Sequence, residues 1–304
     1  MDAIWAKIYT PLGGLLTALV AFGAYYLTMW WSAVTKAKPA QSALELGTGF
    51  VTNFFDTLGI GSFAPTTAIF KFFKIVPDRL IPGTLNVGHT LPTITQAFIF
   101  TAAIPVDPRT LVFMIIAAVA GAWLGAGIVA KWPKRKIQIG MGSALLVAAF
   151  IFAWRNLVES GVLSGAGATL VTGGAGTGTL DLAGLRLAVG LAGNFMLGAL
   201  MTLGIGLYAP CMILVGLLGM NAKAAFPIMM GSCAFLMPIS SATFVKKAAY
   251  ELRPALALGL AGIPAVLIAA LIVENMPIIV VRWLVVGVVI IASVMMLRSA
   301  AKGE

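Results

Sequence analysis

The chain has 304 residues, of which 60% are hydrophobic and 10% charged, and its mean hydropathy is +1.02. Soluble globular domains carry about 25% charged residues, so this composition excludes an ordinary soluble domain and predicts a membrane protein. The net charge of +10 does not indicate a nucleic-acid partner. The basic residues lie in short gaps between apolar runs, where they report orientation in the membrane.

The first apolar run, residues 11–31, predicts a transmembrane helix. It is longer than the apolar core of a signal peptide, and its stronger positive flank, Lys36 and Lys38, follows the run instead of preceding it. We therefore expect a permanent N-terminal helix, which serves either as an assembly contact or as an anchor.

The next segment contains a break that recurs later in the chain. The sequence LGIGSFAP at 58–65 returns as LGIGLYAP at 203–210, with six of eight residues identical. Such internal similarity predicts two homologous repeats. We expect one membrane domain made of an N-terminal helix with its cytoplasmic link, a first repeat, a linker rich in Gly, Ser and Thr, and a second repeat, at residues 1–43, 44–157, 158–185 and 186–304.

Each repeat begins with an apolar segment that Gly-Ile-Gly interrupts. In the first repeat, residues 44–58 are too few to cross a hydrocarbon core of about 30 Å as a helix, and residues 62–73 start a second short helix. We expect a re-entrant hairpin whose bare backbone lines a cavity, and a fully spanning hairpin stays open as the alternative.

Three uninterrupted apolar runs follow each break, and each predicts a transmembrane helix: 82–104, 110–131 and 137–154, then 224–245, 254–273 and 277–297. The predicted fold is an all-α polytopic membrane protein with two inverted repeats, each a Gly-broken helical hairpin plus three transmembrane helices, and an extra N-terminal transmembrane helix. With these seven crossings, 14 of the 20 lysines and arginines share one face. The positive-inside rule then places the C-terminus in the cytoplasm and the N-terminus outside.

The two breaks predict a binding site for an anion. A helix that restarts after a glycine break exposes free N–H groups and the positive end of its dipole, and glycine lets a ligand approach the backbone closely. Close helix packing is the alternative role of such glycines. The candidate residues at the two breaks are Gly59, Gly61, Ser62, Gly204, Gly206 and Leu207.

The run after Pro82 carries a polar stripe. Asn86, His89, Thr93 and Gln96 follow one another at steps of three, four and three, so they share one helical face, which either lines a site or bonds a neighbouring helix. Ser232 is a rough counterpart of this stripe in the second repeat, which contains no histidine.

Two titratable residues are candidates for proton coupling. His89 is the one histidine of the chain, and a packed neutral ring is its alternative role. Asp56 is an acidic residue well inside an apolar segment, and an intramembrane carboxylate is a functional hypothesis by default. It either relays a proton or stays neutral and bonds the free backbone of the hairpin. Beside a bound anion, we expect Asp56 to be protonated or directed away.

Three segments together resemble the TauE/SafE sulfite-exporter family: GFVTNFFDTLGIGSFAP at 49–65, PGTLN at 82–86 and GAWLGAGIVAKWPKR at 121–135. The resemblance covers about residues 44–298 and includes the duplicated glycine turn. It implies a secondary transporter that exports small sulfur-containing anions, such as sulfite or short organosulfonates. It also implies Gly83, Thr84 and Asn86 as candidate ligand contacts.

The predicted function is export of such an anion across the cytoplasmic membrane, with proton coupling open. Asn86, His89 and Ser232 are expected to add directional contacts to the anion. A passive anion channel of the same fold is the first alternative; a non-transporting membrane sensor or an intramembrane enzyme is the second. The sequence shows no signature of metal or nucleophilic catalysis, so we expect no enzyme, cofactor or metal. The expected partners are the anion and membrane lipid, with no nucleic acid, and a homo-oligomer stays open.

Overall fold

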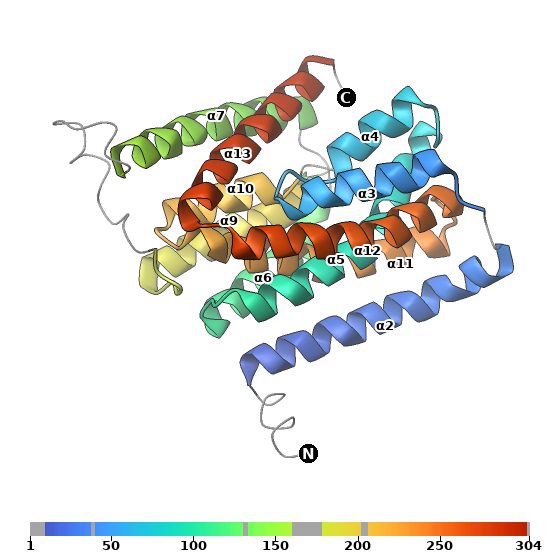
Figure 1. Cartoon of the computed structure of the whole chain (residues 1–304), viewed down its shortest axis with the longest axis horizontal. Helices are drawn as coiled ribbons and strands as arrows, with labels where there is room; N and C mark the ends of the chain where they lie inside the picture. The colour runs from blue at the N-terminus through green and yellow to red at the C-terminus, as the bar shows by residue number, and fades with distance from the viewer. Residues whose placement is uncertain (1–9, 38–39, 130–132, 160–177, 202–205, 303–304) are drawn as a thin grey trace. The chain divides into compact units, whose positions relative to one another are not determined.

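The computed structural model describes residues 10–37, 40–129, 133–159, 178–201 and 206–302. Most of these residues are helical, and the β-type pairing among them is an isolated bridge between Thr179 and Met220. The chain divides into two compact units, and Figure 1 labels the helices of both. Unit 1 contains Met1–Thr57, Gly61–Ala103 and Met230–Glu274, and unit 2 contains Leu58–Ile60, Ile104–Met229 and Asn275–Glu304.

Unit 1 is built from both predicted repeats. Its helices are α2 (Pro11–Ala37), α3 (Ala43–Thr57), α4 (Phe63–Phe72), the short η1 (Asp78–Leu80), α5 (Ile81–Ala103), most of α11 (Ala225–Lys246) and α12 (Leu252–Asn275). Unit 2 contains α6 (Pro108–Val129), α7 (Lys134–Glu159), α9 (Gly184–Met201), α10 (Tyr208–Leu217), η2 (Ala222–Ala224) and α13 (Ile278–Lys302).

The predicted helices are present, with ends that differ by a few residues. The largest difference is at α2, which continues to Ala37, six residues past its predicted end at Trp31. Residues 160–177, which form most of the predicted linker, lie outside the described part of the chain. Within the described residues, six segments are long and apolar enough to cross a membrane: Pro11–Thr35, Arg135–Val158, Gly184–Met201, Ala222–Lys246, Leu252–Asn275 and Ile278–Lys302.

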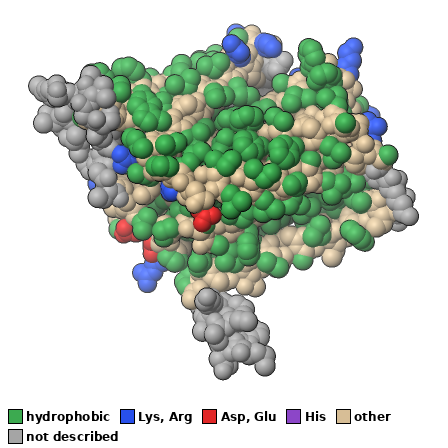
Figure 2. Space-filling model, viewed as in Figure 1, with side chains coloured by type: hydrophobic (Ala, Val, Ile, Leu, Met, Phe, Trp, Pro, Cys, Tyr) green, Lys and Arg blue, Asp and Glu red, His purple; other side chains and the backbone are tan. Residues whose placement is uncertain are grey.

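These six segments suggest a membrane protein and are compatible with multiple crossings. They include α9, which we expected to be the first arm of a hairpin, and they omit α5 and α6, which we expected to cross. Helix α5 carries the polar stripe, which lowers its hydropathy. In α6 the corresponding apolar segment, Pro108–Leu124, is shorter than these six. Large exposed hydrophobic side chains occur in both units, and Figure 2 shows hydrophobic side chains across one face, with most Lys and Arg side chains near its edges.

Helix α3 begins with a capping box. The Ser42 N–H donates to the Glu45 carboxylate (3.0 Å), and the Glu45 N–H donates to the Ser42 hydroxyl (3.2 Å). Glu45 is buried and also forms an ion pair of 2.8 Å with Arg253 at the start of α12. The N-terminus of the hairpin is therefore fixed to α12.

The predicted break lies between α3 and α4. Gly59 and Gly61 have φ angles of +97° and +88°, in the left-handed region that glycine adopts without a steric penalty. The chain therefore turns between Thr57 and Ser62, and Ser62 is the N-cap position of α4. Figure 1 shows α3 and α4 as separate arms joined by this turn.

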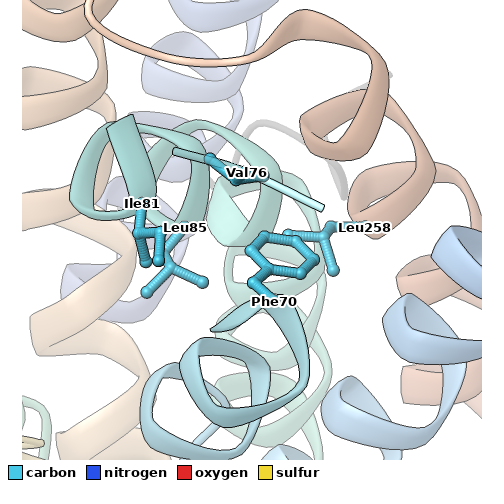
Figure 3. Close-up of a cluster of buried hydrophobic side chains, with 5 residues drawn as sticks. All are labelled: Phe70, Val76, Ile81, Leu85 and Leu258. Carbon is cyan, nitrogen blue, oxygen red and sulfur yellow. The ribbon is translucent and has the colours of Figure 1, made fainter. Parts of the chain in front are cut away.

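A hydrophobic cluster holds the far end of α4. Phe70 packs with side chains from the following turn, α5 and α12, as Figure 3 shows: Val76, Ile81, Leu85 and Leu258. Helix α4 ends in a Schellman motif, in which the Ile75 N–H donates to the Phe70 carbonyl at 2.9 Å. The second arm of the hairpin is thus anchored at the end opposite the break.

The two units share one packing pattern. In unit 1, α3 lies so close to α12 that a Cβ on Gly49 would meet the backbone of Ala257 and Leu258 at 2.8 Å. In unit 2, α9 approaches α6 in the same way, because a Cβ on Gly198 would overlap the Ala118 carbonyl oxygen. The first arm of each predicted repeat therefore packs against the middle long helix of the other repeat.

The N-terminal helix α2 is packed into unit 1. The buried Tyr26 hydroxyl donates to the Val87 carbonyl of α5 at 2.6 Å. Tyr26, Trp30, Val87 and Ala255 form one hydrophobic cluster, to which α2, α5 and α12 all contribute. The helix is therefore part of the packed unit, a role that the sequence did not distinguish from an assembly contact or an anchor.

Candidate functional site

Seven polar residues meet where α3 breaks and α4 begins, all in unit 1 and each no more than 3% exposed. We call them the polar network: Asn53, Asp56, Thr57, Ser62, Thr66, His89 and Gln96. Three lie on α3, two belong to the N-terminal end of α4, and two come from α5. Buried polar groups at this depth require partners, and the network supplies them.

Asp56 closes the break. Its Oδ1 accepts a hydrogen bond from the Ser62 backbone N–H at 2.6 Å, and its Oδ2 accepts one from Gln96 Nε2 at 2.9 Å. We expected Asp56 to be protonated or directed away from the predicted anion site. The side chain is not directed away, because the carboxylate lies against the first N–H of α4. Both oxygens face donors, which is the bonding pattern of an ionised carboxylate. The bond to the free backbone of the hairpin, which we expected of a neutral Asp56, is present, and the proton relay stays a prediction.

His89 joins the two arms of the hairpin. Its Nδ1 lies 2.9 Å from Asn53 Oδ1 on α3, and its Nε2 lies 3.1 Å from Thr66 Oγ1 on α4. The Phe63 ring of α4 lies beside the imidazole, with centroids 5.8 Å apart. The single histidine of the chain is therefore fully buried and bonded at both ring nitrogens.

The bonds form a closed ring. Gln96 Nε2 also donates to Thr57 Oγ1 at 3.0 Å, and Thr57 donates to the Asn53 carbonyl at 2.8 Å. Thr66 Oγ1 also lies 2.7 Å from the Ser62 carbonyl oxygen, which links the histidine side to the Asp56 side. A change at any member therefore reaches the others through short, buried hydrogen bonds.

The two glycines of the break differ in their surroundings. Among the described residues, apart from Gly61 and its two chain neighbours, no heavy atom lies within 4 Å of the place where a Gly61 Cβ would lie, so its surroundings are open. At Gly59 a Cβ would overlap the methyl group of Met212 in unit 2, so this glycine serves close packing. Of the two predicted roles for glycine, approach of a ligand fits Gly61 and packing fits Gly59.

The candidate contacts at the start of α5 have other partners. A Cβ on Gly83 would overlap the Ala249 carbonyl, and the Thr84 hydroxyl accepts a hydrogen bond from the Glu251 N–H at 2.9 Å. Asn86 Oδ1 accepts from the Ser240 hydroxyl at 2.9 Å. These residues join α5 to the end of α11 and to the residues that follow it. The side-chain hydrogen bonds of Thr84 and Asn86 go to these partners and to the preceding turn of the chain, not to the polar network.

The remaining candidates lie in the second repeat. Ser232 is fully buried in α11. Gly204 lies outside the described residues, whereas Gly206 is exposed and Leu207 is the buried N-cap residue of α10. The described residues of the second break include no counterpart of the Asp56 bond, since Gly198, Ala199, Leu200 and Met201 end α9 there.

Three members of the network were not among the sequence candidates: Asn53, Thr57 and Thr66. Asn53, Asp56 and Thr57 follow at steps of three and one on α3, which places them on one helical face and is a signal that could have found them. Among the described residues, no group of three or more His, Cys, Asp and Glu side chains could hold a metal ion.

Comparison with protein-family models, with curated proteins and with solved structures gives no match for this chain. The resemblance of its motifs to the TauE/SafE family therefore stays a prediction, and the arguments below rest on the geometry of the polar network and the break.

Proposed function

We propose that the chain is a secondary transporter of small anions, located in the cytoplasmic membrane with its N-terminus outside and its C-terminus in the cytoplasm. The supporting observation is the break itself. Ser62 begins α4 with its N–H bonded to a carboxylate oxygen, and the neighbouring Gly61 is left-handed with open space beside it. The backbone here already binds one anionic oxygen and leaves room for a ligand to approach.

The packing pattern supports a fold of two inverted repeats, the plan of many secondary transporters. The first arm of each repeat packs against the middle long helix of the other repeat, as expected of two inverted repeats. The buried polar network lies at one of the two breaks. Polar side chains are costly to place inside a membrane, so a buried ring of seven of them is by default a functional hypothesis, here a substrate or ion site.

The substrate class follows from the chemistry of the site and from the motif resemblance. Backbone N–H groups and hydroxyls suit the oxygen atoms of an oxyanion. Sulfite and short organosulfonates are the first substrates to test, because the resemblance implies a sulfur-containing anion moved out of the cell.

The test is flux in liposomes that contain the purified protein. We expect uptake of sulfite and of methanesulfonate, and we expect Gly61→Leu to abolish it because the side chain fills the open approach. Gly184→Leu is the matched control, since Gly184 at the start of α9 in unit 2 is also left-handed (φ +55°) and, among the described residues, also has open space around a Cβ. Accumulation above the outside concentration distinguishes a coupled carrier from a passive channel. Absence of flux for sulfite, methanesulfonate and a wider set of anions rules out the proposal.

A further inference from the structure

The hydrogen bonds around His89 fix the role of its Nδ1 atom. Asn53 Nδ2 donates to the Gly49 carbonyl at 2.7 Å and to the Leu258 carbonyl at 3.4 Å. The amide nitrogen must therefore face these two carbonyls, and Asn53 Oδ1 must face the histidine as an acceptor. It follows that Nδ1 carries a hydrogen in every protonation state of the ring that keeps this bond.

The role of Nε2 depends on the single hydrogen of the Thr66 hydroxyl. When the ring is neutral, Thr66 donates to Nε2. When the ring is protonated, Nε2 donates to Thr66, and the hydroxyl hydrogen turns to the Ser62 carbonyl 2.7 Å away. That carbonyl also accepts from the Thr66 backbone N–H at 3.0 Å, so it is bonded in both arrangements. The ring can therefore gain a proton with no movement of a heavy atom.

Asp56 is less suited to hold the proton. Both of its oxygens accept hydrogen bonds, from the Ser62 N–H and from Gln96 Nε2, so a proton on either oxygen would point toward a donor unless one of these bonds breaks. His89 has the opposite arrangement, since the Asn53 Oδ1 acceptor faces its Nδ1 and the Thr66 hydroxyl, which can accept as well as donate, faces its Nε2. The donor and acceptor pattern thus places the negative charge on Asp56 and offers the positive charge to His89.

A buried imidazolium is costly without a balancing negative charge. Helix α3 presents Asn53 and Asp56 to this region, and α4 presents Phe63 and Thr66, so Asp56 is the one other titratable group in the network. Its charge is already engaged by two donors. The charged residues of the other helices that contact α5 lie near helix ends: Lys36 on α2, Asp78 and Arg79 on η1, Lys246 on α11, and Arg253 and Glu274 on α12.

From these observations we infer that the transported anion and one proton bind together, with the proton on His89. This inference rests on the proposed function. An anion that enters beside Gly61 adds a second negative charge next to Asp56, and a proton taken from water onto Nε2 compensates it. By linkage, the proton strengthens anion binding by the same factor by which the anion strengthens protonation. The carrier is therefore a proton–anion symporter.

The first test observes His89 directly. Because the chain contains one histidine, protein labelled with ring-¹⁵N histidine and purified without a histidine tag gives one pair of ring signals. We expect the Nδ1–H tautomer without anion and conversion to imidazolium when methanesulfonate is added at the same pH. Thr66→Val, which lacks the acceptor, should lose this conversion. Thr67→Val should keep it, because Thr67 makes the same type of bond, to the Phe63 carbonyl, outside the network. If the His89 ring signals do not change on addition of methanesulfonate, in protein that transports methanesulfonate, the inference is overturned.

The second test measures coupling. With the outside one pH unit more acidic than the inside, one proton per monovalent anion drives about tenfold accumulation of methanesulfonate. His89→Gln should reduce flux and lose the response to the pH difference, whereas Asp56→Asn should retain the response. The opposite result would place the proton on Asp56 and overturn the inference. If the flux of the wild type does not depend on the pH difference, the coupling alone is refuted. If no anion is transported at all, the proposed function is refuted.

Discussion

The Asp56 carboxylate and the Ser62 backbone N–H, six residues apart, are joined by a hydrogen bond of 2.6 Å that bridges both left-handed glycines of the break. The bond fixes where α3 ends and where α4 begins. It also means that the proposed anion site is shaped by an anionic side chain of the protein itself.

Removal of this bond should destabilise the hairpin. Asp56→Ala leaves the buried Ser62 N–H without its acceptor, a loss of about 1–3 kcal/mol. Asp56→Asn keeps one oxygen for that N–H and should cost less. Thermal unfolding in detergent measures both variants. Equal unfolding temperatures for Asp56→Ala and the wild type would show that the bond does not hold the break.

The two glycines of the break should respond differently to alanine. Both substitutions place a Cβ on left-handed backbone, at a cost of about 1–2 kcal/mol. Gly59→Ala also displaces the Met212 side chain, so it should lower the unfolding temperature further, whereas Gly61→Ala should have the larger effect on flux per folded protein. Flux and thermal unfolding measured on the same preparations separate the two effects. The reverse order would assign ligand approach to Gly59.

Helices α6 and α9 should not tolerate a side chain at their contact. A Cβ on Gly121 would overlap the Phe195 carbonyl, and one on Gly198 would overlap the Ala118 carbonyl. Alanine at either position should destabilise the protein by about 1–3 kcal/mol. The control is Gly140→Ala on α7, where the space is open and the gain in helix propensity is about 1 kcal/mol. Stable Gly121→Ala and Gly198→Ala variants would contradict the close approach of these helices.

One position outside the proposed site should accept glycine with a gain in stability. Ala248 follows α11, is exposed, and has a φ of +49°, a conformation that costs an alanine roughly 1 kcal/mol. We therefore expect Ala248→Gly to raise the unfolding temperature. Ala249→Gly, whose φ is not positive, should give no increase and serves as the control. A lower unfolding temperature for Ala248→Gly would show that the strain is absent.

Hydrophobic runs and proline positions were sufficient to predict the helices, because in lipid a spanning segment must satisfy its backbone internally. The break was also predictable, since Gly59 and Gly61 mark a turn. The pairing of α3 with α12 and of α9 with α6 was not predictable, because small residues on apolar helices do not identify the helix they approach.

The site was predicted in part. Asp56, Ser62, His89 and Gln96 stood out because a polar side chain is conspicuous in an apolar run. Asn53 and Thr66 did not, because threonine and asparagine in such helices commonly bond their own backbone, as both do here. Their second bonds, to His89, depend on how α3, α4 and α5 pack together, which no local pattern encodes.

The single histidine also determines how the membrane voltage acts on the proposed carrier. A monovalent anion that moves with one proton transfers no net charge. Each uncompensated charge that crosses the membrane would change the free energy of transport by about 2.3 kcal/mol at a potential of 100 mV. The negative interior of a cell therefore does not oppose inward movement of the loaded carrier. The pH difference and the anion concentrations alone decide whether the cell gains or loses the anion.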